Sequence, residues 1–171
     1  MTTDSIYTDE VLGGYTSGVE IHDPVGSGIP LPASAVGVGG GIAIFAGKVF
    51  YMGGRNGATS LSVVHVITDP AVDEWTEVTA TYTIGVRAFF GCVVHESLLY
   101  IIAGAITTTT YTDEIRTISG LGVASVSAGT TPFGAKTVTA VAVNPSILYT
   151  FGELQAGGQN FAPDVYRFSI L

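Results

Sequence analysis

Three tyrosines recur at one interval in this chain, and that interval constrains the fold more than any other feature. Tyr51, Tyr100 and Tyr149 each lie 49 residues from the next. Each closes a similar, mostly apolar run, namely Lys48-Val49-Phe50-Tyr51, Ser97-Leu98-Leu99-Tyr100 and Ser146-Ile147-Leu148-Tyr149. Self-similarity at a fixed period of this size is typical of repeat architectures. We therefore expect the chain to consist of structurally repeated units.

A second apolar run precedes each tyrosine run, and the two together predict a tight β-hairpin. The upstream runs cover residues 42–45, 92–94 and 141–143. Short turn-forming pairs connect them to the tyrosine runs, at Ala46-Gly47, His95-Glu96 and Asn144-Pro145. Three residues after each tyrosine comes a small residue at which a strand can end and the backbone turn sharply, namely Gly54, Ala103 and Gly152.

Each unit then resumes with further strands after a polar loop. Third strands are predicted at residues 64–67, 115–118 and 165–168, and fourth strands at 74–78 and 123–128. No helical periodicity is sustained anywhere, so the chain is expected to be all-β. Four short antiparallel strands repeated roughly every 40 to 50 residues are typical of β-propeller blades.

The repeat divides the chain into blades within a single domain, residues 1–171. We expect a partial blade at 1–40, blades at 41–88 and 89–136, and an incomplete blade at 137–171. The first segment fits the repeat in two ways, since residues 19–24 match residues 64–70, whereas residues 7–11 match residues 111–115. Both cannot supply the third strand. Either register predicts two or three strands in this segment.

The first complete unit resembles the kelch repeat. It has an apolar strand, a tight turn, a second apolar strand that ends in Tyr51-Met52-Gly53-Gly54, a loop, and Trp75 at the fourth strand. The double glycine becomes Ala103-Gly104 in the second unit and Phe151-Gly152 in the third, and only the first unit has a tryptophan. The resemblance implies a kelch-like β-propeller of about 3.5 repeats, built from four-stranded antiparallel sheets.

Charged residues are scarce and mostly acidic. They make up 12% of the chain, against roughly 25% in an ordinary soluble domain. Six Lys and Arg face 14 Asp and Glu, for a net charge of −8, which argues against nucleic acid as a partner. No apolar run approaches the roughly 20 residues of a membrane helix, and the first residues lack the features of a secretory signal. No membrane insertion is expected, and the sparse charge favours extensive contacts with other chains.

Histidine and cysteine form no recognisable reactive constellation. His22, His65 and His95 fall at different places in the repeat, without the spacing of a metal site. His65 alternates with valines, and we expect it to face solvent or to be hydrogen-bonded within a blade. Cys92, the only cysteine, lies in an apolar run and is interpreted as a small buried hydrophobe.

Glycine and acidic clusters also have ordinary structural interpretations. The glycine-rich residues 37–41 precede a strand, whereas a dinucleotide-binding fingerprint follows one and opens a helix. Asp69, Asp73 and Glu74 lack the ligand alternation of a calcium loop, so we interpret them as a solvated turn. No metal, cofactor or catalytic residue is predicted.

Two cationic positions recur in the connectors between units. Arg87 and Lys136 lie 49 residues apart, and we interpret them as structural partners of a carboxylate or carbonyl, with an acidic ligand at the axis as the alternative. The loops 55–60, 107–111 and 153–161 could present contacts to a glycan or a protein. The candidate binding residues are Arg55, Arg87, Lys136, Tyr111, Asn160 and Phe161.

Three functions from different classes are compatible with these features. The first is a non-enzymatic structural or interaction subunit of a larger assembly, and the Thr-, Gly- and Ala-rich composition is loosely similar to that of phage virion decoration or fibre proteins. A virion or extracellular assembly is the favoured location. The alternative is a carbohydrate- or protein-binding module, and the third is an enzyme with an axial site. The expected partners are copies of the chain or other subunits.

Closure of the ring and burial of the strands can be predicted from the repeat. Propellers typically close with four to eight blades, so the chain must form a minimal four-bladed ring or, as we favour, pair with a neighbouring copy to give about six. Tyr51, Tyr100 and Tyr149 are expected at equivalent places in successive sheets. The residues expected to be buried between blades are Val49, Phe50, Leu99, Leu148, Ile44, Val93 and Val141.

Overall fold

Antiparallel β-sheets build the part of this chain that the structure describes, and no α-helix occurs in that part. The structure is a computed structural model. It describes residues 6–7, 10–11, 14–15, 18–21, 29–30, 32, 34, 37–68, 74–132, 134–138, 140–144, 147–151 and 165–169. The prediction of an all-β chain with four-stranded antiparallel sheets is confirmed over these residues.

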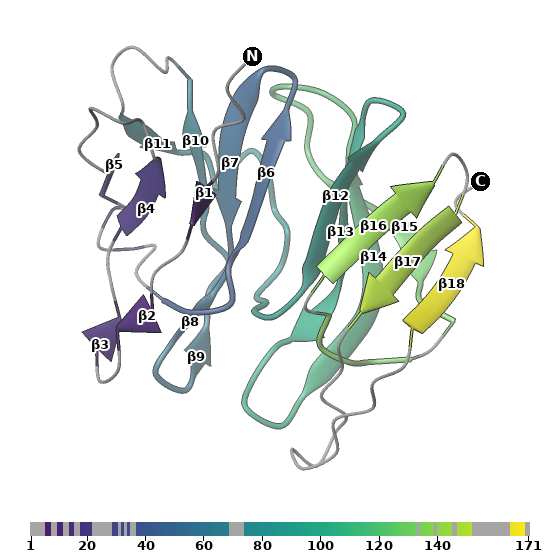
Figure 1. Ribbon diagram of the computed structural model, residues 1–171. Helices are drawn as coiled ribbons and strands as arrows, with labels where there is room; N and C mark the ends of the chain where they lie inside the picture. Colours follow the sequence, from purple (N-terminus) through teal and green to yellow (C-terminus); the bar gives the residue numbers. More distant parts are fainter. Residues whose placement is uncertain are drawn as a thin grey trace.

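Three successive sheets contain most of the described residues (Figure 1). The first sheet consists of β6 (Gly41–Phe45), β7 (Lys48–Met52), β10 (Val64–Ile67) and β11 (Trp75–Glu77), in that order. The second consists of β12 (Gly91–His95), β13 (Leu98–Ala105), β14 (Tyr111–Ile118) and β15 (Val126–Thr130). The third consists of β16 (Ala140–Asn144), β17 (Ile147–Phe151) and β18 (Val165–Ser169).

The later strands differ from the predicted bounds in the second unit. The third strand of the first unit occupies residues 64–67 as predicted, but β14 begins at Tyr111 rather than at residue 115. A register shift between Ile102 and Gly104 lets β13 and β14 continue to pair as far as Ala105. The fourth strands were predicted at 74–78 and 123–128, whereas β11 is shorter and β15 lies three residues later at its start.

Short strands precede the first sheet and interrupt its loop. They are β1 (Ile6–Tyr7), β2 (Glu10–Val11), β3 (Gly14–Tyr15), β4 (Gly18–Ile21) and β5 (Ile29–Pro30), followed by β8 (Arg55–Asn56) and β9 (Thr59–Ser60) in the loop. β4 pairs with both β1 and β5 in a three-stranded sheet, while β2-β3 and β8-β9 form two-stranded sheets. Both N-terminal segments that matched the repeat therefore contain strand.

The first hairpin turn lies where it was predicted, and the second lies one residue later. Phe45 pairs with Lys48, so Ala46-Gly47 forms the first turn, as predicted. The closing pair of the second hairpin is His95 with Leu98, which leaves Glu96-Ser97 as the turn instead of His95-Glu96. Both residues of each turn have positive φ (49° and 74°, then 46° and 64°), as a type I′ turn requires. In the third unit Asn144 pairs with Ile147, so Asn144 belongs to the strand and not to the turn.

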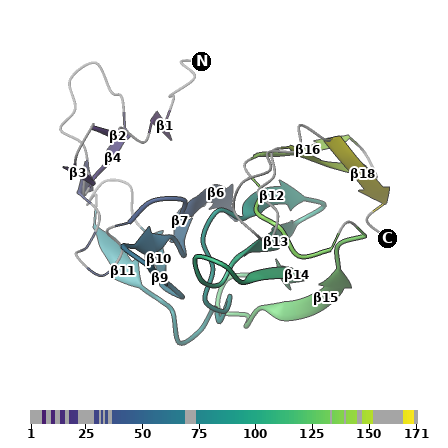
Figure 2. The same ribbon diagram turned by 90° about the horizontal axis from the view of Figure 1, so that it is seen from below.

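The first strand of each sheet lies next to the first strand of its neighbour. β12 contacts β6 on one side and β16 on the other. Figure 2 shows these three strands at adjacent ends of their sheets, with β11 and β15 farther away. The three sheets are thus packed face to face in chain order.

Apolar clusters fill the spaces between the sheets. The largest cluster joins Phe50, Met52 and Val64 of the first sheet to Leu99 and Ile101 of the second. A separate cluster, with Tyr100, Ile102, Ile115 and Val138, covers the opposite face of the second sheet, on the side of the third. Alternate residues of β13 therefore pack into two different apolar clusters, because successive side chains of a β-strand point to opposite faces of the sheet.

The structural repeat is not uniform, and this overturns the predicted equivalence of Tyr51 with Tyr100. Backbone bonds join Phe89 N to Gly39 O (2.7 Å) and Val138 N to Phe89 O (2.8 Å), so equivalent positions are 50 residues apart and then 49. Counted from the hairpin turns, Phe50 is equivalent to Tyr100 and Tyr149, while Tyr51 is equivalent to Ile101. Tyr51 accordingly packs with Ile67 and Trp75 on the other face of the first sheet.

The same register decides which predicted core residues are buried. Phe50 and Leu99 are fully buried, as predicted, and Val49 and Val93 are half-buried against apolar clusters. Ile44 is 63% exposed, so the prediction that it is buried is wrong. Its neighbours Ala43 and Phe45 point into the core between the first two sheets, so Ile44 points away from that core. The side chains of Leu148 and Val141 lie outside the described residues.

Candidate functional site

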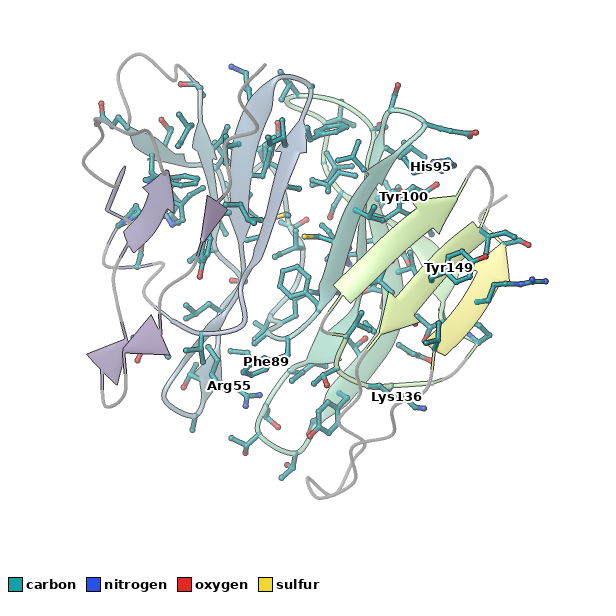
Figure 3. All side chains as sticks on the ribbon, in the orientation of Figure 1. Arg55, Phe89, His95, Tyr100, Lys136 and Tyr149 are labelled. Carbon is teal, nitrogen blue, oxygen red and sulfur yellow. The ribbon has the colours of Figure 1, made fainter. Side chains whose placement is uncertain are left out.

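The loops and connectors with the candidate binding residues emerge at one end of the sheets, opposite the hairpin turns. Arg55, Phe89 and Lys136 all lie toward the lower end of the molecule in Figure 3, whereas His95 lies beside a hairpin turn near the upper end. The antiparallel order of the strands explains this arrangement, because second-to-third loops and the connectors between sheets leave from the same edge.

Arg55 spans the space between two sheets at this end. It lies on β8 in the loop of the first unit, and its Nη2 donates a hydrogen bond to the carbonyl oxygen of Thr107 in the loop of the second (2.6 Å). The guanidinium also lies over the ring of Phe89, 5.2 Å from its centroid, in a cation–π arrangement. The sequence predicted Arg55 as a binding residue, and the structure shows it in contact with the loop of the next sheet.

Phe89 has a strained backbone at the start of the second sheet. Its φ of 52° is in the left-handed region, which bulky residues rarely adopt. The equivalent Gly39 also has positive φ (68°), and the ring of Phe89 lies directly over that glycine, where a Cβ would overlap it. Such conformations persist only where the surroundings hold them, here through bonds from Phe89 to Gly39 and to Val138.

Arg87 is the buried member of an ion-pair network whose other members, Glu114 and Arg116, are half-buried. Its side chain is 2% exposed, and Nη2 donates to Glu114 Oε2 (2.9 Å) while Nη1 donates to the carbonyl oxygen of Ala103 (3.3 Å). Glu114 also accepts a hydrogen bond from Arg116 Nε (3.0 Å), and Arg116 Nη1 donates to Thr83 O and to Ser125 Oγ. These contacts fix the connector to β14, which is the structural pairing interpreted for Arg87 from the sequence.

The charges in this network keep the carboxylate ionised. Burial favours the neutral form of Glu114, but hydrogen bonds and charges from Arg116 and Arg87 outweigh it, so its pKa lies below the ordinary value. Burial lowers the pKa of Arg87, and Glu114 opposes that change. A carboxylate held ionised between two arginines is not suited to proton transfer near neutral pH. The ionised carboxylate therefore links the two arginines.

Stability should decrease in acid through this carboxylate. Because the pKa of Glu114 is lower in the folded chain than in the unfolded one, its contribution is complete above the unfolded pKa of about 4.5 and is lost as pH falls through the folded pKa. Melting temperatures measured from pH 7 to pH 3 should therefore converge between the native chain and Glu114→Gln as pH falls. Parallel melting profiles for the two chains would contradict this contribution.

Lys136 is equivalent to Arg87 in the backbone, which supports the 49-residue spacing of this pair. The amide of Gly104 bonds to Lys136 O (2.8 Å), just as the amide of Gly54 bonds to Arg87 O (3.0 Å). Lys136 is half-buried and Tyr111, the first residue of β14, is also half-buried. A binding role for these residues stays a prediction. Asn160, Phe161 and Gly152 lie outside the described residues.

A second polar group, centred on His65, lies on the opposite face of the first sheet. His65 is buried, so the alternative that it faces solvent is wrong, and its Nε2 lies 3.4 Å from Ser34 Oγ. Burial lowers the pKa of His65, and the charge of Glu77 partly opposes this change. Nearby, burial raises the pKa of Tyr51 to about 12, and the ring of Tyr51 meets Trp75 edge to face. The alternation of His65 with Val64 and Val66 places it on the face opposite the valines but does not show what covers that face.

Cys92 and the other candidate ligands show no reactive arrangement in the described residues. The thiol of Cys92 donates to Ile42 O (3.1 Å) and packs against the main core, and burial raises its pKa to about 11. Such a thiol is poorly nucleophilic. Across the described part of the chain, no three His, Cys, Asp or Glu residues come together as a metal site, and no helix there could cross a bilayer.

Comparison with known proteins gives a fold and no family. No protein-family model matches the chain, and no curated protein shows significant sequence similarity. Solved structures do match, 108 chains in all, among them one described as the structure of YjhT. That match has a TM-score of 0.63 at 12% sequence identity and covers 85% of this chain. The chain spans 55% of the YjhT chain, so the similarity concerns the fold of little more than half of that protein.

Proposed function

We propose that this chain is a non-enzymatic structural subunit whose sheets are kelch-like propeller blades, and that another copy of the chain completes the ring. The fold similarity to a larger structure, of which this chain spans 55%, supports an incomplete set of blades. The adjacency of β6, β12 and β16 supports their assignment as the inner strands around a common axis.

One comparison of equivalent residues carries the proposal. Val64, Ile115 and Val165 occupy equivalent positions on the third strands of successive sheets, paired with Met52, Ile102 and Phe151. Val64 is 0% exposed and packs in the cluster between the first two sheets, and Ile115 is 7% exposed and packs in the cluster with Val138. Val165 is 56% exposed. The third sheet thus presents an apolar residue at a position that is elsewhere buried between sheets.

One neighbouring residue on this face repeats the pattern. Tyr149 is equivalent to the buried Tyr100 but is half-buried. Exposed apolar surface of this kind usually marks a contact with another chain. Charged residues make up only 12% of the chain, which also favours extensive contacts with other chains.

The proposal predicts a mass larger than that of one chain. Light scattering after gel filtration should give a multiple of 17.6 kDa for the native chain. Val165→Asp should shift the mass toward a single chain, because it places a charge in the proposed interface. Thr109→Asp, in an exposed loop, serves as the matched control and should leave the mass unchanged. A native chain that is monomeric at every concentration, with Val165→Asp identical to it, would contradict the proposal.

A further inference from the structure

The outer strands of the three sheets differ in how they protect their free edges. An exposed edge strand can pair with another chain, and natural proteins usually prevent this with short strands or charged side chains. β11 has only three residues and includes the exposed Glu77. β18 contains the exposed Arg167 near its centre. Two of the three outer strands are thus protected by charge.

β15 lacks this protection. All five of its residues, Val126–Thr130, are exposed, and none is charged. The uncharged segment extends from residue 117 to residue 135. Register with β14 makes Ser127 the counterpart of Glu77, because Arg116 and His65 are their equivalent partners. The charged residue of β11 is therefore replaced by serine in β15.

Apolar side chains gather beside this edge. Val126 is apolar and 58% exposed, whereas the equivalent residue of β11 is the polar Thr76. Leu121 and Val123, immediately before the strand, are also among the large apolar residues that are exposed. An open edge flanked by exposed apolar residues is a surface for strand addition.

We propose that β15 pairs in antiparallel fashion with β15 of a second copy of this chain. A two-fold pairing brings a strand against itself, so the strand must be compatible with its own sequence. Pairing of β18 centred on Arg167 would place two arginines opposite each other, which is unfavourable, whereas pairing of β15 centred on Ser127 places Val126 opposite Ala128 without any charge. This inference rests on the proposed assembly role but assigns a surface separate from the face of Val165.

The bulge in β15 limits how much of the strand is used. Ile115 pairs with Gly129 and Arg116 with Ser127, so Ala128 is the extra residue, and Gly129 has a φ of 121°. Bulges bend an edge away from a partner. Pairing is thus limited to Val126–Ala128, the part of the strand that ends at the bulge.

Sedimentation equilibrium on the whole chain tests the β15 contact with two charge variants. Ser127→Glu should weaken self-association at least tenfold, because the two-fold pairing places the new carboxylates opposite each other. Ser119→Glu adds the same charge at an exposed position outside the strand and should associate like the native chain. Equal association of all three chains would overturn the proposal.

Hydrogen exchange gives a readout that is independent of mass. The amides of Val126–Ala128 should exchange at least tenfold more slowly at high than at low protein concentration in the native chain, and not in Ser127→Glu. Exchange at these amides that does not depend on protein concentration would overturn the β15 contact. The same result is expected if the natural partner of this edge is a different protein rather than a second copy. If Val165→Asp then still lowers the mass, the assembly proposal stands. If Ser127→Glu alone lowers it, the β15 contact stands and the ring-closing contact fails.

Discussion

Arg87→Ala is expected to lower the free energy of unfolding by about 3 kcal/mol. The substitution removes a fully buried guanidinium and leaves both Glu114 and the carbonyl of Ala103 without this donor. Removing one partner of a buried pair typically costs about 3 to 5 kcal/mol, because the remaining charge is uncompensated. Glu114 keeps its bond to Arg116, so the lower end of that range applies.

Urea denaturation of paired variants separates charge from volume in this effect. Arg87→Met retains most of the side-chain volume, so the difference between the methionine and alanine variants measures packing. The double variant Arg87→Met with Glu114→Gln should recover part of the loss, because the half-buried carboxylate that has lost one of its two arginine partners is then absent. If Arg87→Ala has the stability of the native chain, the network does not hold the connector to β14.

Phe50→Ala should cost about 3 to 5 kcal/mol of unfolding free energy, as a core truncation. Phe50 is fully buried between the first two sheets, and its ring meets Phe45 and Tyr82 edge to face, with centroids 5.9 Å and 5.4 Å away. The other strand of the hairpin provides the matched control. Ile44→Ala should change stability by less than about 0.5 kcal/mol, because Ile44 is already mostly exposed.

Chemical denaturation of these two variants tests the assignment of faces in the first hairpin. Ala43 pairs with Phe50 and Ile44 with Val49, so Phe50 and Ile44 lie on opposite faces of one hairpin and their substitutions are expected to differ several-fold in effect. Phe50→Leu should lie between the native chain and the alanine variant. If Ile44→Ala lowers the free energy of unfolding strongly and Phe50→Ala lowers it little, the face of the first hairpin that carries Ile44 is the one that packs in the core.

The error over Tyr51 shows how far the repeat could be read from sequence. The strands and hairpins were recognisable because apolar runs and turn residues act locally. The face on which each side chain lies was not recognisable, because the first unit has one residue more than the second. A slip of one residue moves every side chain of a strand to the opposite face. Phe50 and Tyr51 are both aromatic, so matching tyrosine to tyrosine selected the wrong member of the pair.

The candidate site was less accessible to such reasoning. Arg87 and Lys136 were found because their spacing follows the connectors, and the structure gives their carbonyls equivalent partners. Glu114 was not found, because it lies 27 residues from Arg87 and only the packing of the connector against β14 brings the two together. His65 was ambiguous for a similar reason, since the burial of a strand face depends on what covers it.

The two backbone bonds of Phe89 affect how this molecule can come apart. In many repeat proteins each unit touches only its neighbours, and units at the ends can fray independently of the rest. Here the amide of Phe89 bonds to Gly39, two residues before β6, and its carbonyl accepts a bond from Val138, two residues before β16. Opening the second unit at this point breaks its ties to both of the others at once. We therefore expect the three sheets to unfold as one cooperative unit rather than in sequence from an end.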